Sequence, residues 1–243
     1  YGRVLRARDR RVRGIVEERD ATPAERRGRE CNSGIYCFEP RRLWPALEAV
    51  ARQAGRNAQK ELYLTDVIAD LARRGGPVET VRVADPREVA GVNDRRQLAM
   101  LEGLLRARTL DALMTAGVTV LDPAATYVDA TVTVGRDTVL HPGVRLSGRT
   151  VIGEGCVIGT GAQVTDTALG DRVTLRPYCV LDGSRVEADA VLGPFARLRR
   201  GTVVERDAEI GNFIELKQAT IGRGVKAHHV GYIGDATVGE GAN

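Results

Sequence analysis

Aromatic residues are scarce in this sequence: Phe, Trp and Tyr together make up 4% of its 243 residues. A core built from large rings is therefore excluded. Hydrophobic residues nevertheless account for 43% of the chain, which is enough for real cores in one large or two ordinary domains. We expect at least one of these cores to be thin and packed from small aliphatic side chains.

Paired cysteines and targeting segments are also lacking. The four cysteines, Cys31, Cys37, Cys156 and Cys179, form no CxxC pair and have no zinc-site spacing. Cys156 and Cys179 are expected to be small buried thiols. No signal or transmembrane stretch is recognisable. Reduced thiols without such a stretch predict a cytoplasmic protein with no membrane partner.

Neither sign of charge dominates, because the formal net charge is +4 and acidic and basic residues are interspersed. This argues against a nucleic-acid partner and suits small anionic substrates. Lysine is rare: the 36 Lys and Arg residues include only Lys60, Lys217 and Lys226. A lysine in so arginine-rich a chain suggests that a compact ammonium group is needed at its position.

The second half of the chain carries an aliphatic anchor residue at every sixth position, apart from short slips. A period of six fits neither a helix nor a simple strand, and it is the hexapeptide signature of a parallel β-helix. The alternative, an ordinary sandwich with accidental spacing, is disfavoured by the number of anchors in phase. These anchors are Val134, Leu140, Leu146, Ile152, Ile158, Val164, Leu169, Leu175, Leu181, Leu192, Leu198, Val204, Ile210 and Leu216.

Small residues and glycines follow the anchors at fixed distances. Four residues after an anchor stands a small or β-branched residue, as expected for a narrow triangular core. Glycine often comes directly after the anchor, where we expect a tight corner with positive φ. The small residues are Thr138, Val144, Thr150, Cys156, Ala162, Ala196, Thr202 and Ala208, and the glycines are Gly135, Gly153, Gly159, Gly170, Gly193, Gly211 and Gly222.

The first 93 residues are predicted to be part of an α/β domain. It contains no glycine-rich phosphate loop, so any such loop would precede Tyr1. We expect strands at 12–17, 31–38 and 78–83, a helix at 40–54 that stops at Gly55, and a helix capped by Thr65 that closes at Gly75-Gly76. A leucine-rich linker helix is expected at 94–117 and the β-helix at 118–243. The chain lacks an initial methionine and stops in mid-repeat at Asn243, so we expect a segment of a longer protein.

Two cations are predicted to stack on the β-helix. If three hexapeptides form one coil, residues 18 apart lie about 4.8 Å apart in adjacent strands. Arg199 and Lys217 are 18 apart, and each follows an anchor. Stacked cations repel each other unless an anion such as phosphate lies between them. The alternative is a solvated surface pair.

The repeat is expected to break at residues 226–232, which include His228 and His229. A break in a regular coil predicts a loop, and histidine is the natural general base near neutral pH. The pair is not predicted to bind a metal, because no third ligand has suitable spacing. His141, in a regular coil, is expected at the surface.

The sequence resembles a known family at residues 1–3, 14–17, 32–34, 63–66 and 91–93, and again at 193–199, 211–217 and 226–235. It is similar to the bacterial bifunctional N-acetylglucosamine-1-phosphate uridyltransferase/glucosamine-1-phosphate acetyltransferases. The resemblance implies the C-terminal part of a Rossmann-like nucleotidyltransferase domain at 1–93, followed by a left-handed parallel β-helix. It also implies a cytoplasmic homotrimer that makes a precursor of peptidoglycan and lipopolysaccharide.

In the first domain the resemblance implies uridyl transfer from UTP to N-acetylglucosamine-1-phosphate. Gly2, Glu17, Asn32 and Asn93 would contact the amino-sugar nucleotide, and Asn93 would also help to bind Mg²⁺. Ser33 stands where a threonine is usual. We expect the chain alone to lack this activity, because the remaining site residues would precede its start.

In the β-helix the resemblance implies acetyl transfer from acetyl-CoA to the amine of glucosamine-1-phosphate. Arg199 and Lys217 would hold the sugar phosphate, and His229 would be the catalytic base. Tyr232 and Asn243 would help to hold the sugar. Arg200 replaces the proline that is usual after Arg199 in the family.

Two other functions remain open from the residues alone. One is a related sugar-1-phosphate nucleotidyltransferase with a β-helix tail. The other is a non-catalytic β-helix that serves as an oligomerisation scaffold. The scaffold predicts no effect of Lys217 or His229 on any activity.

Overall fold

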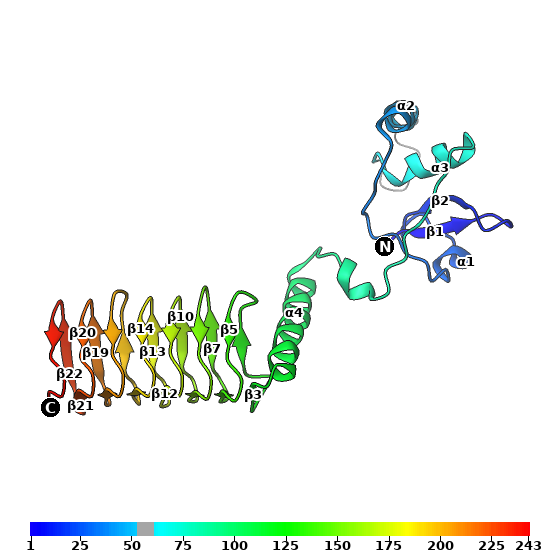
Figure 1. The fold of residues 1–243 in the computed structure, drawn as a ribbon. Helices are drawn as coiled ribbons and strands as arrows, with labels where there is room; N and C mark the ends of the chain where they lie inside the picture. The colour runs from blue at the N-terminus through cyan, green and yellow to red at the C-terminus, as the bar shows by residue number, and fades with distance from the viewer. Residues whose placement is uncertain (53–60) are drawn as a thin grey trace. The chain divides into compact units, whose positions relative to one another are not determined.

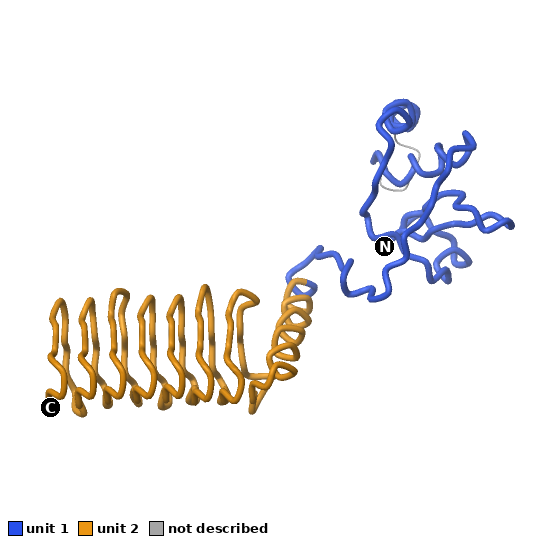
Figure 2. Tube along the Cα trace, viewed as in Figure 1, with its two compact units in different colours: residues 1–97 blue, residues 98–243 orange. Residues whose placement is uncertain are grey.

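The computed structural model describes residues 1–52 and 61–243. The chain divides into two compact units, residues 1–97 and 98–243 (Figure 2). The predicted stop at Gly55 and the lysine Lys60 lie outside the described residues. Each unit is built around its own core.

The first unit is an antiparallel hairpin with short helices. Strand β1 pairs with β2, and α3 packs on β2, where the Ala69 Cβ approaches the Gly14 backbone. Ala46, Val50 and Val67 form the buried centre between α2 and α3. The elements are β1 (Arg3–Arg6), β2 (Val12–Val16), α1 (Pro23–Arg26), α2 (Pro40–Ala51), α3 (Thr65–Arg73) and the 3-10 helix η1 (Pro86–Val89).

Strand β2 confirms one of the three strands predicted in this unit, and the other two predictions are wrong. The described residues 31–38 make only an isolated bridge between Cys31 and Arg3, and residues 78–83 form no strand. The side chains of Asn32 and Ser33 accept hydrogen bonds from the backbone N–H groups of Gly34 and Ile35. These local bonds favour a turn over a sheet ladder.

The prediction for α3 is wrong at its N-terminal end and confirmed at its C-terminal end. Thr65 is the first residue of the helix, not its cap, and its hydroxyl donates to Glu17 Oε1 at 3.1 Å. The C-terminal end is confirmed: Gly75 has a φ of 73° and its N–H donates to the Ala72 carbonyl. The Gly76 N–H donates to the Leu71 carbonyl, which completes a Schellman-type end.

A helix, α4 (Arg95–Thr115), lies where the linker was predicted. Its buried residue is Leu110, which packs into the end of the β-helix core with Leu113 beside it. Leu110 and Leu113 lie in the last turns of α4, so this end of the helix meets the β-helix core. The Arg106 guanidinium lies 4.3 Å from the ring centre of Tyr127, and Arg145 stacks there at 5.2 Å. These cation–π contacts hold α4 on the first two coils.

The second unit confirms the parallel β-helix (Figure 1). In residues 98–243, all of which the structure describes, three seven-stranded parallel sheets form its sides. Sheet I contains β3 (Thr119–Val120), β6 (Val139–Leu140), β9 (Val157–Ile158), β12 (Thr174–Leu175), β15 (Val191–Leu192), β18 (Glu209–Ile210) and β21 (Lys226–Ala227). Sheet II contains β4 (Tyr127–Val128), β7 (Arg145–Ser147), β10 (Gln163–Thr165), β13 (Val180–Asp182), β16 (Arg197–Leu198), β19 (Ile214–Lys217) and β22 (Gly231–Gly234). Sheet III contains β5 (Thr133–Val134), β8 (Val151–Ile152), β11 (Ala168–Leu169), β14 (Arg185–Val186), β17 (Val203–Val204), β20 (Thr220–Ile221) and β23 (Thr237–Val238).

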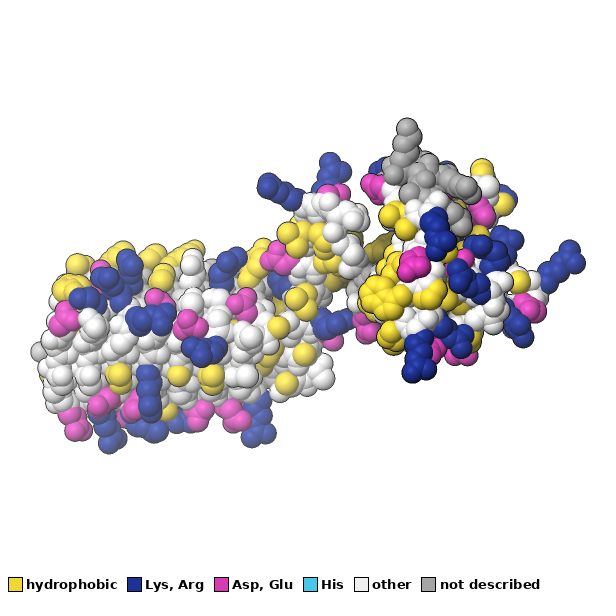
Figure 3. Space-filling model, turned by 90° about the horizontal axis from the view of Figure 1, so that it is seen from above, with side chains coloured by type: hydrophobic (Ala, Val, Ile, Leu, Met, Phe, Trp, Pro, Cys, Tyr) yellow, Lys and Arg dark blue, Asp and Glu magenta, His cyan; other side chains and the backbone are white. Residues whose placement is uncertain are grey.

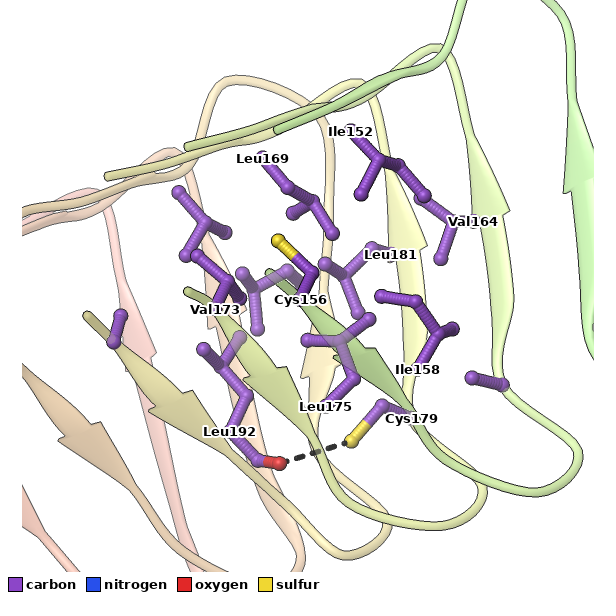
Figure 4. Close-up of a cluster of buried hydrophobic side chains, with 14 of the residues drawn as sticks. Ile152, Cys156, Ile158, Val164, Leu169, Val173, Leu175, Cys179, Leu181 and Leu192 are labelled. Atoms are coloured by element: carbon purple, nitrogen blue, oxygen red, sulfur yellow. Dashed lines mark hydrogen bonds between the residues drawn. The ribbon is translucent and has the colours of Figure 1, made fainter. Parts of the chain in front are cut away.

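The anchors and the small residues fill the interior as predicted. Figure 4 shows Ile152 and Leu169, from adjacent strands of sheet III, and Leu181, from sheet II, directed into the same interior. Cys156 and Cys179 are fully buried free thiols, and the Cys179 Sγ lies 3.5 Å from the Leu192 carbonyl oxygen. Burial raises the pKa of the Cys156 thiol and raises that of Cys179 to about 11.

The predicted reason for the glycines is wrong at all but one position. Among these glycines only Gly193 has a positive φ, and most positive φ values in the β-helix fall two or three residues after an anchor, for example at Asp166 and Phe195. The other glycines are needed because the next coil passes too close for a side chain. A Cβ on Gly159 would lie 2.6 Å from the Leu175 carbonyl oxygen.

The predicted break at residues 226–232 is also wrong. Lys226 pairs in register with Glu209, and Tyr232 pairs with Glu215, so the coil continues through this segment. The anchor positions are occupied by Ala227 and Ile233, which are packed against the core. The small side chain of Ala227 hid the repeat in the sequence.

Candidate functional site

The outer face of sheet II gathers charged side chains on β13, β16 and β19. Because β-strand residues alternate, the residues next to the buried Leu198 and Leu216 face outward. The register therefore places Arg197 beside Glu215, and Arg199 beside Lys217. Arg197, Arg199 and Lys217 border an open cavity of about 440 Å³, whose lining is completed by Val180, Asp182, Leu198, Arg200 and Gln218.

Arg199 and Lys217 occupy adjacent coils, as their spacing predicted. The backbone N–H of Arg199 donates to the Leu216 carbonyl at 2.8 Å, which fixes the two coils against each other. Each cation has a carboxylate partner. The Arg199 guanidinium lies 3.3 Å from Glu215, and the Lys217 ammonium lies 3.2 Å from Asp235. These pairs relieve the repulsion, so the stacking does not itself require a bound anion.

Glu215 is a candidate site residue that the sequence reasoning missed. Its carboxylate lies between two guanidinium groups, 3.3 Å from Arg199 and 4.0 Å from Arg197. The spacing of 18 residues between Arg197 and Glu215 would have revealed this contact. The 18-residue count was applied only to residues that directly follow an anchor, whereas Arg197 and Glu215 directly precede one.

Arg200, which departs from the family pattern, points back along the coils. Its guanidinium lies 3.1 Å from Asp182 and 3.5 Å from Asp166. The pKa of Asp166 is lowered, first by the backbone N–H of Arg149 and then by Arg200. The aliphatic part of Arg200 packs over Gly183, which has a φ of 54°. Arg200 thus bridges three successive coils at the edge of the cavity.

His229 lies just before β22, the strand that pairs with β19, and Tyr232 on β22 is in register with Glu215. His229 is exposed in the corner before β22, and Tyr232 is 59% exposed on β22. Neither residue lines the cavity that contains Arg199 and Lys217. Asn243 is exposed after Ala242, whose carbonyl accepts the Lys226 N–H at 2.9 Å. The described chain therefore puts the predicted phosphate-binding and catalytic groups at the neighbouring strands β16, β19 and β22 of one sheet.

A second cavity, of about 300 Å³, lies beside His228, in the corner between sheets I and II. The Glu209 carboxylate on its wall is paired with Lys226 and with His228, at 3.2 Å in each case. Lys226 first, and then His228, lower the pKa of Glu209. The half-buried His141 lies in an earlier coil, where a surface position was predicted.

In the first unit three predicted residues lie together. The Asn32 N–H donates to the Gly2 carbonyl at 2.9 Å, and the Asn32 amide donates to the Tyr36 hydroxyl at 2.7 Å. A Cβ on Gly2 would lie 3.2 Å from Glu17 Oε1, so glycine leaves open the space beside this carboxylate. Burial raises the pKa of Tyr36, which the Asn32 amide lowers and Glu17 raises. Burial, followed by the charges of Asp20 and Glu17, also raises the pKa of Asp66.

Asn93 does not share a contact with that group among the described residues. Its N–H donates to Gln97 Oε1 at 2.6 Å, and nearby Gly91 donates to the Tyr1 hydroxyl. Mg²⁺ requires several oxygen ligands in octahedral geometry, and Asn93 supplies one amide oxygen. Within residues 1–52 and 61–243, no group of three or more His, Cys, Asp or Glu residues is arranged to hold a metal ion. The described residues alone therefore do not fit Mg²⁺.

The surface of the second unit carries interspersed charges of both signs along the face seen in Figure 3. This agrees with the mixed pattern read from the sequence. Among the described helices, none is long and apolar enough to cross a membrane.

Comparisons with known proteins extend over the whole chain. Residues 131–166 match the family described as bacterial transferase hexapeptide (six repeats). The Bifunctional protein GlmU of Anaeromyxobacter sp. (strain Fw109-5) is 47% identical over 243 residues, which are 100% of this chain and 49% of that protein. The Bifunctional protein GlmU of Mycobacterium bovis (strain BCG / Pasteur 1173P2) is 48% identical over 244 residues, covering 100% of this chain and 48% of that protein.

Among solved structures, the acetyltransferase domain of PglB from Neisseria gonorrhoeae FA1090 in complex with acetyl coenzyme A is 20% identical, with a TM-score of 0.36. The match covers 58% of this chain and 65% of that chain. The curated relatives confirm the resemblance that the motifs predicted: this chain is similar to bifunctional GlmU proteins over its whole length, and it spans about half the length of those relatives.

Proposed function

We propose that this chain belongs to a bifunctional enzyme of UDP-N-acetylglucosamine synthesis and that its β-helix, taken to be left-handed, catalyses N-acetyl transfer to glucosamine-1-phosphate. The main support is that Arg199 and Lys217 lie beside each other on adjacent coils at the cavity. The chain that carries them is 47% identical to a Bifunctional protein GlmU. Acetyl-CoA is the proposed acetyl donor.

Arg199 and Lys217 are proposed to bind the sugar phosphate. Both are partly exposed and paired with exposed carboxylates, and such pairs contribute little to stability. A phosphate can therefore replace Glu215 and Asp235 as the partner of the two cations at small cost. A phosphate oxygen between a guanidinium and an ammonium accepts charge-assisted hydrogen bonds from both.

His229 is proposed to act as the general base. The sugar 2-amine attacks the thioester carbonyl, His229 accepts the amine proton, and the C–S bond breaks to release the CoA thiol after protonation. Tyr232 lies on β22, which follows His229 in the chain, and is proposed to help hold the sugar with Asn243. His229 precedes β22 and Lys217 ends the neighbouring strand β19, so the substrate would extend along the outer face of these strands.

The first unit is proposed to be the C-terminal part of a Rossmann-like nucleotidyltransferase domain, spanning 1–93 before the linker at 94–117. The contacts among Gly2, Asn32 and Glu17 support a role for them in holding the amino-sugar nucleotide formed from UTP. Asn93 would contribute one oxygen to Mg²⁺, which would offset phosphate charge when bound. The described residues do not complete that metal site.

The assembly and location are further parts of the proposal. The proposal includes a cytoplasmic homotrimer formed through the β-helix, acting on small molecules and not on nucleic acid, as the family resemblance implies. Sedimentation of the purified protein tests the trimer, since a monomer would contradict it.

The central experiment measures CoA release from acetyl-CoA with glucosamine-1-phosphate, using the complete protein that carries this chain. We expect turnover in the parent protein and its loss in His229→Ala, while uridyl transfer from UTP is retained. Loss of both activities in this variant would contradict separate sites. Absence of acetyl transfer in the parent protein would favour the sugar-1-phosphate nucleotidyltransferase, and absence of both activities would favour the scaffold.

A further inference from the structure

Three corners between sheets I and II are held by a column of aromatic rings. Tyr178 stacks on Phe195 with ring centroids 5.3 Å apart, and Phe195 stacks on Phe213 at 5.0 Å. The rings are inclined by only 11° and 4°. The register of β19 and β22 places Val230 next in this column. An aliphatic side chain cannot continue the stack, so the corner that carries His229 lacks this support.

A different set of contacts holds the His229 corner. The N–H of Gly211 donates to the Ala227 carbonyl, and a Cβ on Gly211 would lie 2.6 Å from the backbone carbonyl carbon of His228. The corner therefore rests directly on the preceding coil. This close approach fixes its height along the β-helix, but it does not prevent the corner from tilting sideways.

Glu209 contacts the His229 corner from the side, through Lys226 and His228. One carboxylate oxygen lies 3.2 Å from the Lys226 ammonium, and the other lies 3.2 Å from His228 Nε2. Glu209 thus contacts both ends of the segment Lys226–His228 from the strand of the coil before it. This segment leads directly into His229.

We propose that Glu209 and His228 are positioning residues for His229, and this inference rests on the proposed role of His229 as the base. His228 is tied to Glu209 and so orients the corner from which the next residue projects. A displacement of about 1 Å at a reacting group is enough to lower a rate by roughly 100-fold. The pair acts through His229 and does not contact the reacting atoms.

The test compares His228→Ala, Glu209→Ala, the double variant and the conservative His228→Gln in the complete protein. We expect each alanine variant to lower kcat for acetyl transfer by about 10- to 100-fold. The KM values for glucosamine-1-phosphate and acetyl-CoA should change by less than about twofold, because substrate binding does not depend on this corner. The double variant should lose no more than the worse single variant, since the two residues form one contact.

His228→Gln should recover most of the rate, because the Gln amide can donate to Glu209. Asp207→Ala is the matched control, since it breaks the exposed ion pair with Arg223 elsewhere on the same coil and should leave kcat unchanged. A kcat within about twofold of the parent in both alanine variants would overturn the proposal, and so would additive losses in the double variant. If His229→Ala remains active while His228→Ala is inactive, the base assignment itself fails, which is a separate outcome.

Discussion

Gly153 lies directly against the backbone of Gly170 in the next coil: a Cβ on Gly153 would come 2.6 Å from the Gly170 carbonyl carbon. The φ of Gly153 is not positive, so its backbone conformation is open to any residue. Glycine is required here by the separation of the coils and not by the turn. This distinction decides what an alanine would do.

Gly153→Ala should lower the free energy of unfolding by about 1–3 kcal/mol, because the coils must move apart to admit the methyl group. Gly103→Ala in α4 is the matched comparison, since a Cβ there would meet nothing within 4 Å. It should stabilise the chain by about 1 kcal/mol through helix propensity. Denaturant unfolding measures both. Equal effects of the two substitutions would contradict the close stacking.

The glycines also show how far the sequence pattern could predict the structure. The six-residue period determined which side chains face inward, because burial of an aliphatic residue on each side is a local requirement. The distance between coils is set by backbone hydrogen bonds across the sheets. The spacing of residues in the sequence carries no information about that distance. The turn at residues 31–38 was mistaken for a strand for a similar reason, since its apolar pattern does not show whether a partner strand is present.

Prediction of the candidate site was similarly uneven. Counting 18 residues placed Arg199 beside Lys217, because that coil contains three full hexapeptides. The pair Ile214 and Gly231 is separated by 17 residues, so the same count fails one coil later. The counter-ions Glu215 and Asp235 could not be foreseen from a rule about cations alone.

The two buried cysteines should be inert to a thiol reagent until the β-helix unfolds. At pH 8 we expect Cys31 and Cys37 to react with an aromatic disulfide reagent, because both are exposed, while Cys156 and Cys179 are protected. Burial raises the pKa of Cys179 from 9.0 to about 11, so the folded thiol stays protonated. The protonated Cys179 thiol therefore stabilises the folded chain below pH 9, and this contribution is lost as the pH rises toward 11.

Reaction at all four sites in the native protein would contradict this burial. The pH dependence has its own check: Cys179→Ala should weaken the loss of melting temperature between pH 9 and 11. Cys31→Ala, at an exposed thiol, should leave the pH profile unchanged.

The proposed phosphate site predicts opposite effects for a cation and its counter-ion. Lys217→Ala should raise the KM for glucosamine-1-phosphate by about 10-fold or more, since one charge-assisted hydrogen bond to phosphate is lost. Asp235→Asn should leave this KM unchanged or lower it, because the phosphate no longer competes with the carboxylate. Asparagine tolerates the φ of 50° at this position.

Initial-rate measurements on the complete protein test both variants. Arg136→Ala serves as the control, because Arg136 is paired with Glu154 on an early coil, away from the cavity. A rise in KM with Asp235→Asn as large as that with Lys217→Ala would argue that the pair is structural and that phosphate is bound elsewhere.

The column of Tyr178, Phe195 and Phe213 should stabilise the β-helix although its rings are partly exposed. Phe195 contacts both neighbours, and each stacked pair is worth about 0.5–1.5 kcal/mol. Phe195→Ala should therefore lower the free energy of unfolding by about 1–3 kcal/mol. Tyr178→Ala removes one stacked pair and should cost about half as much.

Phe195 has a φ of 58°, which a side chain with a Cβ adopts only at a cost. Phe195→Gly loses the same stacking but removes that cost, so it should be more stable than Phe195→Ala by about 1 kcal/mol. Thermal unfolding should thus rank the parent protein first, F195G second and F195A third. If F195A matches the parent, the stacked rings contribute nothing to stability. If F195G is the most stable of the three, the strain at this corner exceeds what the stacking supplies.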